Sequence, residues 1–473
     1  MQDELGLTFL YRAETEKIGN ALSSKNTDID EADIYFLENH DQYSCAYVLL
    51  KFLYKHYLGN VEGGRFNIKI NGKTLKYDRI PLSLPVPSEQ NQKQILWDYD
   101  SLSSLMYAVK KTARAHLKSI DEKGSLEYIK KVLYPASADK LIGQLRHDDF
   151  GRQKILDYAY ALGMDTKETR EFLDAAGQNP LFNLWDPDEL LMYYAIALKG
   201  GLSPSKLEYL KNAEGGKEEA PLASSFARDT EKENKGAMFN TAYIKSDVDD
   251  IIELGDKDAS LKKMKELLSS VRKRAKKDSE TARKLLNDLF EYILDNIDRI
   301  RDKNKWVMRH GGDKERMRND LLNHFWYYSN NQMQVREEYV FAKNSVKRQL
   351  PTKAHIDAVY NKKEMVTKED LEFAFFLKFA LDNPLDLKDH RKDEIKEKAQ
   401  ERYQKYRTDL ETDILVNNGY LGINDKSPFD RLLLVCIMND KPVSMMFNIT
   451  NKCFFKGSSL NKLSTMEKED FLI

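Results

Sequence analysis

Cysteine is scarce in this chain, and no two cysteines have the spacing that a shared site would need. Cys45, Cys436 and Cys453 are odd in number and far apart, and the sequence contains no Cys-x-x-Cys pair. This pattern indicates neither a disulfide framework nor a zinc knuckle. It is typical of proteins that work in a reducing cytoplasm, where we expect this protein to be.

Long hydrophobic runs are also missing. The apolar run "LLMYYAIAL" at 190–198 is far shorter than the roughly 20 residues that a membrane-spanning helix needs. The opening residues, "MQDELGLTFLYRAETEK", lack the basic segment followed by an apolar segment that marks a secretory signal. We therefore expect a soluble, intracellular protein without a membrane partner.

The common catalytic and cofactor motifs do not occur. There is no Gly-rich phosphate loop of the type GxxxxGK[ST], no GxGxxG and no HExxH, and the eight histidines are scattered. The histidines have no cysteine or carboxylate neighbours at the spacing of metal ligands. The sequence therefore predicts no cofactor and no metal site.

Charge is abundant but balanced, because 75 Lys and Arg face 76 Asp and Glu, for a net charge of −1. The net charge therefore gives no general argument for nucleic-acid binding, which needs a basic excess somewhere on the chain. Locally, residues 261–320 hold 18 Lys and Arg against 11 Asp and Glu. If nucleic acid binds, this basic stretch is where we expect it; the alternative is a solvated helix face. The candidate nucleic-acid-binding residues are Arg272, Lys273, Arg274, Lys276 and Lys277.

One short pattern in the same stretch suggests catalysis. In "RMRNDLLNH", Arg318 and a following asparagine precede His324 by a turn or two. The pattern resembles the site of HEPN ribonucleases, small helical dimers, and implies His324 as acid or base and Arg318 as stabiliser of phosphorane charge. On an ideal helix, however, six residues leave the two side chains about 120° apart. We therefore expect this pair not to be catalytic.

The hydrophobic pattern is mostly helical, with one exception near the N-terminus. "RFNIKINGKTLKYDRI" at 65–80 alternates apolar and polar residues around Asn71-Gly72, the strongest short signal for a β-hairpin. A two-residue loop places Ile68 opposite Leu75 and Phe66 opposite Tyr77. We expect a small α+β domain here.

Two stretches of the chain follow the same order. "TREFLDAAGQNPLFNLWDPDELLMYYAIAL" begins at Thr169, and "TDILVNNGYLGINDKSPFDRLLLVCIMND" begins at Thr412. In each, a helix ends near a glycine (Gly177, Gly419), and a turn follows. A polar-Pro pair, Asp186-Pro187 or Ser427-Pro428, then starts the next helix. The spacing of Asp165 and Glu168 predicts a capping box on the helix before the first turn. We interpret both stretches as one helix–turn–helix packing unit used twice.

The longer run "RQKILDYAYALGMDTKETREFLDAAGQNPLFNLWDPDELLMYYAI" resembles the tandem helical repeats of gut Firmicutes proteins, often labelled helix-turn-helix or lambda-repressor-like. The resemblance covers 148–213 and, more loosely, 409–440. It implies a DNA-binding transcriptional regulator. The residues argue against direct readout, because four acids in the candidate recognition helix would be repelled by phosphates. These acids, which outnumber Lys167 and Arg170, are Asp165, Glu168, Glu171 and Asp174.

We expect a mainly α, multidomain helical protein with a small N-terminal α+β part containing a β-hairpin. The most consistent function is that of a non-enzymatic regulatory or scaffold protein that binds protein partners through its helical units. A DNA-binding regulator is the first alternative and a HEPN-like ribonuclease the second. The expected segments are an α+β domain (1–140), repeat unit 1 (141–211), a flexible acidic linker (212–256), a basic helical region (257–345) and a helical domain with repeat unit 2 (346–473).

Overall fold

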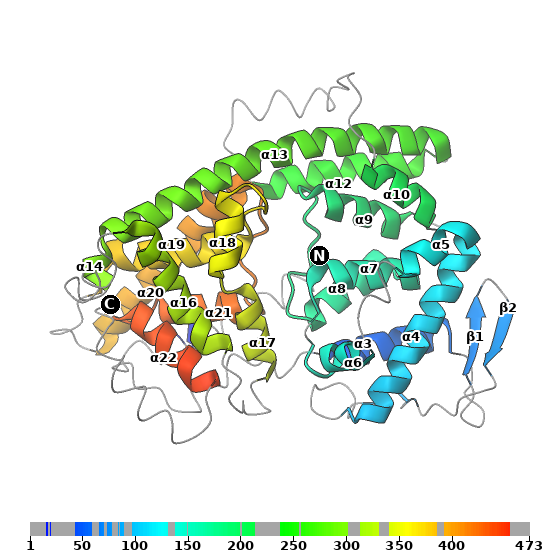
Figure 1. Ribbon diagram of the computed structural model, residues 1–473, viewed down its shortest axis with the longest axis horizontal. Helices are drawn as coiled ribbons and strands as arrows, with labels where there is room; N and C mark the ends of the chain where they lie inside the picture. Colours follow the sequence, from blue (N-terminus) through cyan, green and yellow to red (C-terminus); the bar gives the residue numbers. More distant parts are fainter. Residues whose placement is uncertain are drawn as a thin grey trace. The chain divides into compact units, whose positions relative to one another are not determined.

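The structure is a computed structural model. It describes residues 16, 17, 19, 43–58, 66–70, 73–77, 84, 86–88, 97–130, 138–148, 150–198, 201–212, 237–254, 257–300, 313–330, 340–385 and 392–454. The chain forms two compact units: His40–Lys276, and Lys277–Ile473 together with Met1–Asn39. The described residues are mainly helical, as the hydrophobic pattern predicts (Figure 1).

The unit His40–Lys276 is built around one continuous core that runs from Cys45 to Val271. The core draws on residues from both sides of position 140, so helices of the first two expected segments pack together. The five expected segments stay predictions. The described elements of this unit are α3 (Cys45–His56), β1 (Phe66–Ile70), β2 (Lys73–Tyr77), α4 (Tyr99–Ile120), α5 (Glu122–Tyr128), α6 (Ala138–Arg146), α7 (Arg152–Leu162), α8 (Thr166–Ala175), α9 (Pro187–Ala197), α10 (Pro204–Asn212), α12 (Ala237–Glu253) and the first part of α13 (Lys257–Asp295).

The strands β1 and β2 pair antiparallel, with Ile68 opposite Leu75 and Phe66 opposite Tyr77. Their side chains lie outside the described residues, and the α+β domain expected around them stays a prediction.

The structure describes only part of the expected linker, 212–256. Residues 213–236 lie outside the described residues, whereas Ala237–Glu253 forms the helix α12. Ile244, Val248 and Ile251 of α12 are buried in the core. Because these three residues recur at helical spacing, they give the segment an apolar stripe to bury. The helix thus begins inside the segment that composition alone assigned to a linker.

The unit that contains Lys277–Ile473 has its own core, from Ala282 to Ile449. The boundary between the units falls inside α13, a helix of 39 residues. The elements after α13 are α14 (Ile297–Ile300), α16 (Lys314–Asn330), α17 (Val340–Gln349), α18 (Lys353–Tyr360), α19 (Lys368–Asp382), α20 (Lys392–Asp409), the π-helical turn η5 (Leu410–Leu415), the 3-10 turn η6 (Val416–Asn418), α21 (Pro428–Cys436) and α22 (Pro442–Phe454).

The duplicated pattern folds as a duplicated structure. Gly177 and Gly419 both end a helix with positive φ, 65° and 81°. Asp186 caps α9 and Ser427 caps α21, with proline as the first helical residue in both cases. The capping box of Asp165 and Glu168 is present on α8. These local predictions are confirmed, because caps depend on residues only two to four positions apart.

Each copy also holds its turn with a cation at the start of an earlier helix. In the first copy, Arg152 begins α7 and its Nε lies 2.5 Å from Oε1 of Glu189 on α9. The other carboxylate oxygen of Glu189 accepts the backbone N–H of Asn183 in the turn, at 2.8 Å. The guanidinium also donates to the carbonyls of Asn179 and Leu181. We call this arrangement the Arg152 latch.

The second copy repeats the arrangement with other residues. Lys368 begins α19, and its Nζ lies 2.7 Å from Oδ2 of Asp430 on α21. The same oxygen accepts the backbone N–H of Asn424 at 2.7 Å. We call this the Lys368 latch. Asn183 and Asn424 both stand six residues before the carboxylate that they contact, so the two turns share one hydrogen-bonding plan.

Candidate functional site

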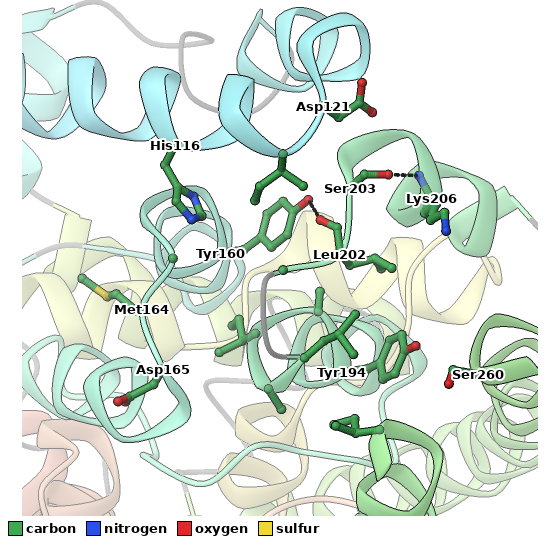
Figure 2. A pocket seen from close by; sticks show the side chains of 18 of the residues that line it. His116, Asp121, Tyr160, Met164, Asp165, Tyr194, Leu202, Ser203, Lys206 and Ser260 are labelled. Atoms are coloured by element: carbon green, nitrogen blue, oxygen red, sulfur yellow. Dashed lines mark hydrogen bonds between the residues drawn. The ribbon is translucent and has the colours of Figure 1, made fainter. Parts of the chain in front are cut away.

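A cavity of about 990 Å³ lies in the unit His40–Lys276 (Figure 2). Small-molecule sites in proteins enclose roughly 300–1,000 Å³, so the volume suits an organic ligand. Most of its lining comes from three places where one helix ends and the next begins: α4 to α5, α7 to α8, and α9 to α10; Ile252 of α12 and Ser260 and Leu261 of α13 complete it. Backbone and capping groups therefore make up much of its polar lining.

Each of the three helix starts is capped by a residue that lines the cavity. Asp121 accepts the N–H of Gly124 on α5 at 3.0 Å, and Asp165 accepts the N–H of Glu168 on α8 at 2.8 Å. Ser203 Oγ accepts the N–H of residue 206 on α10 at 3.3 Å. These caps use up backbone donors and bring two carboxylates to the wall.

His116 enters the cavity wall from α4 as a neutral acceptor. Its Nδ1 lies 3.2 Å from the carbonyl oxygen of Ala161. Because a carbonyl only accepts hydrogen bonds, Nδ1 carries the proton and Nε2 keeps its lone pair. Burial lowers the pKa of His116 below its usual range, despite the bond to Ala161, so the ring is neutral near pH 7.

Gly163 allows His116 to lie where it does. This residue ends α7 with φ 72°, the left-handed conformation that glycine adopts without strain. A Cβ at this position would lie 2.5 Å from Nε2 of His116. Any side chain here would therefore both strain the turn and push the imidazole aside.

Three hydroxyl groups of the lining already donate their protons to backbone carbonyls. Ser119 Oγ donates to His116 at 2.6 Å, and Tyr160 Oη donates to Leu202 at 2.6 Å. Ser260 Oγ donates to the carbonyl of Ile251 at 3.0 Å. With two carboxylates and the imidazole Nε2 beside them, these groups offer hydrogen-bond acceptors, whereas the Lys206 ammonium and the hydroxyls of Tyr194 and Ser203 are donors of the same lining.

The helix that the repressor resemblance would use for reading DNA faces another helix of its own unit. Glu168 on α8 lies 2.7 Å from Nζ of Lys55 and 2.6 Å from Nε2 of His56, both on α3. Glu171 lies 3.3 Å from Nζ of Lys51, one turn earlier on α3. Glu168 and Glu171 of α8 therefore serve to hold α3 and α8 together.

The five candidate nucleic-acid-binding residues on α13 divide into two groups. Arg272 donates from Nη2 to the carbonyls of Leu210 and Lys211 at the end of α10, at 3.0 Å each. The guanidinium of Arg274 lies over the ring of Trp185, 5.5 Å from its centroid. These two arginines thus have packing roles. The exposed members of the run are Lys273, Lys276 and Lys277.

Arg318, the weak catalytic candidate, packs against α18. Its Nη2 lies 2.9 Å from Oδ1 of Asp357, and its guanidinium carbon lies 4.4 Å from the centroid of the Tyr360 ring. The side chain of His324 lies outside the described residues, so whether the two side chains converge stays untested. The contacts of Arg318 are those of a residue that holds α16 to α18.

Sequence reasoning did not single out the cavity or the two latches. His116 is one of eight scattered histidines, and its partner Ala161 lies 45 residues away. The latch pairs are 37 and 62 residues apart. The one local signal was the repeated Asn at a fixed distance before an acidic residue, in "NLWDPDE" and "NDKSPFD".

Comparison of the chain with protein-family models, curated proteins and solved structures finds no match. Within the described ranges, no three His, Cys, Asp or Glu side chains gather as they would around a metal ion. None of the helices described is both long and apolar enough to cross a bilayer.

Proposed function

We propose that this chain is a non-enzymatic regulatory or scaffold protein of the cytoplasm, which binds protein partners through its two helical repeat units. The proposal rests on what the charged residues of the two repeats contact. Arg152, Glu189, Lys368 and Asp430 are all engaged in holding turns. Charged residues that hold turns in place are engaged in structure rather than in a reaction. They also keep the neighbouring surface in one conformation for a protein partner.

The turn of the first repeat offers such a surface. The Arg152 latch holds the carbonyl of Leu181, while the Leu181 side chain is 48% exposed. A leucine displayed on a rigid turn loses little conformational freedom when a partner covers it. We therefore assign Leu181 as an anchor for a protein partner.

Sequence-specific DNA binding through α8 is less well supported. Lys51, Lys55 and His56 of α3 already pair with the acids of α8. A helix that enters the major groove needs a free face with basic or neutral side chains. The regulator suggested by the resemblance remains an alternative for other surfaces of the chain.

Nucleic-acid binding through α13 is the second candidate, because Lys273, Lys276 and Lys277 are exposed on one helix. Three phosphate contacts would give weak, salt-sensitive and sequence-independent binding. The ribonuclease hypothesis has less support, because Arg318 is occupied by Asp357 and Tyr360.

The test is a comparison of two exposed leucines in the same unit. The full chain is cross-linked in lysate of its source cells as wild type, as Leu181→Ser and as Leu126→Ser, whose leucine is 42% exposed on α5. We expect Leu181→Ser to lose a protein that wild type and Leu126→Ser both retain. Identical protein capture by all three, or capture of nucleic acid that Lys273→Glu/Lys276→Glu/Lys277→Glu abolishes, would contradict the proposal.

A further inference from the structure

The lining of the cavity contains a buried hydroxyl group that holds no part of the fold together. Tyr194 stands on α9, and its side chain is 1% exposed. No described residue forms a hydrogen bond with its hydroxyl group, whereas the hydroxyl of Tyr160 is bound to Leu202. The Tyr194 oxygen is not among the polar atoms that are sealed in the core without a partner. The small exposed part of Tyr194 therefore includes this oxygen, and the cavity is the space that the residue lines.

The hydroxyl of Tyr194 is a donor that waits for an acceptor. Burial raises its pKa above the ordinary range, so the phenol keeps its proton near neutral pH. A buried donor has lost its hydrogen bonds with water, and an acceptor brought by a ligand restores one of them. No neighbouring charge contributes to the raised pKa. The oxygen therefore faces surroundings that suit an uncharged acceptor.

The charged groups of the lining serve other purposes. Asp121 and Asp165 cap the starts of α5 and α8. The ammonium of Lys206, the one cation among the described residues of the lining, has no effect on the pKa of Tyr194. A charged ligand would thus find no opposite charge beside the Tyr194 hydroxyl.

Most of the other residues that line the cavity are small or apolar. Tyr194 lies between Leu202 and Ser260 in the close view (Figure 2). Apolar walls of this kind bury a hydrocarbon or aromatic body, while a single polar group fixes its orientation. The larger apolar members of the lining are Ile120, Leu198, Leu202, Ile252 and Leu261.

We infer that the cavity binds a small neutral molecule with an apolar body and a hydrogen-bond acceptor, such as a ketone, an ester or an ether, to which Tyr194 donates its hydroxyl proton. The apolar walls supply most of the affinity, and the hydroxyl selects molecules that carry an acceptor. This inference is independent of the proposed scaffold role, which rests on the repeat turns.

The test compares 4-phenylbutan-2-one, which has a carbonyl acceptor, with propylbenzene, which has none. Both are titrated into the full chain at pH 7.5 and followed by ligand-observed NMR. Tyr194→Phe removes the donor and keeps the ring. We expect it to weaken binding of the ketone about fivefold, as the loss of one hydrogen bond does, and to leave the affinity for propylbenzene unchanged.

Tyr193→Phe serves as the matched control. Its hydroxyl is bound to Asp249, and Tyr193 is not among the residues that line the cavity. This variant should bind the ketone as wild type does. The charged probes 4-phenylbutylamine and 4-phenylbutyrate should bind wild type more weakly than the ketone.

Thermal unfolding shows whether both variants fold. Tyr194→Phe should unfold no earlier than wild type, because it loses no hydrogen bond within the described residues. Four results would overturn the inference: no binding of the ketone by wild type, tighter binding of either charged probe, unchanged ketone affinity in Tyr194→Phe, or an equal loss of both neutral probes in that variant.

Discussion

In the first repeat, Arg152 meets one carboxylate, that of Glu189, whereas in the second repeat Lys368 meets two, those of Asp430 and Glu372. Leu156 stands four residues after Arg152, and Glu372 stands four residues after Lys368. Both are buried. The same backbone arrangement therefore holds a balanced ion pair in one copy and an acid-rich cluster in the other.

The difference follows from the shapes of the two cations. The guanidinium of Arg152 spreads its donors over Glu189 and two turn carbonyls. The ammonium of Lys368 is a compact charge that cannot span this distance. In the second repeat a further arginine, Arg407, holds the turn through two bonds to Asp425, at 2.7 and 2.6 Å. Arg152 alone thus holds the turn of the first copy, whereas Lys368 and Arg407 together hold the turn of the second.

The acid excess has an electrostatic consequence. Burial raises the pKa of Glu372 well above its usual range, and the charge of Asp430 raises it further against the opposing effect of Lys368. Burial alone would lower the pKa of Lys368, but Asp430 and Glu372 raise it above its ordinary value. Burial and the neighbouring acid therefore favour the protonated form of Glu372 more than in a free glutamate.

Removal of the ammonium should have the largest effect. Lys368→Met leaves Asp430 and Glu372 buried without their cation, and breaking a buried pair in this way costs about 3–5 kcal/mol. We expect the unit containing Lys277–Ile473 to unfold at a much lower urea concentration, as followed by circular dichroism. An unchanged midpoint would show that the ammonium does not compensate the cluster.

Exchange of the cation type in the first repeat should have a smaller effect. Arg152→Lys keeps the charge opposite Glu189 but loses the bonds to Asn179 and Leu181, at a cost of about 1–2 kcal/mol. Amide hydrogen exchange of residues 178–186 should accelerate, while that of 420–426 stays unchanged. Equal protection in both proteins would mean that the turn is held by other contacts.

Removal of Glu372 should make the Lys368 latch resemble the Arg152 latch, in which the cation meets one carboxylate. Glu372→Leu leaves Lys368 paired with Asp430, and we expect stability to rise by about 1 kcal/mol at pH 7, since a carboxyl group that is unfavourably buried is replaced by an apolar group. The raised pKa of Glu372 gives the sign with pH: its contribution is fully present below its unfolded pKa and is lost as pH rises through the folded value.

The gain from Glu372→Leu over wild type should therefore grow as pH rises above about 4.5, the ordinary range of a glutamate. Urea unfolding at several pH values measures this difference. A constant difference would show that Glu372 titrates normally.

The smallest effect is expected at the start of α19. His355 lies 2.7 Å from Asp370, which forms the capping box of that helix with the N-cap Thr367, and 2.5 Å from Glu364. The bond to Asp370, with help from Glu364, raises the pKa of His355 to about 9 against the effect of burial. Because solvent screens this partly exposed group, we expect about 1 kcal/mol of stabilisation.

Since the folded pKa is above the unfolded one, this stabilisation is complete below pH ~6.5 and is lost as pH rises through the folded value. His355→Gln should remove it, so wild type and variant should differ at pH 6 and converge by pH 10. Persistence of the difference at pH 10 would assign the effect to packing.

The helix caps could be predicted from the sequence because each depends on neighbours. Asp165 finds its partner three residues away, and proline at the first position fixes the start of α9 and α21. The latches could not, since Arg152 and Glu189 meet only after α7 and α9 pack. The cavity could not be predicted either, because His116 and Gly163 come together only in the folded unit.

Gly163 and His116 also provide a means of recognising other chains with this cavity. The imidazole leaves no room for a Cβ at position 163, so a chain that keeps the histidine must keep the glycine. In a chain without the histidine, the clash with the imidazole no longer disfavours a side chain at position 163, and only the positive φ still favours glycine. Two positions 47 residues apart, one on a helix and one in the turn that it covers, should therefore change together. This paired pattern should remain detectable in relatives whose remaining sequence has diverged.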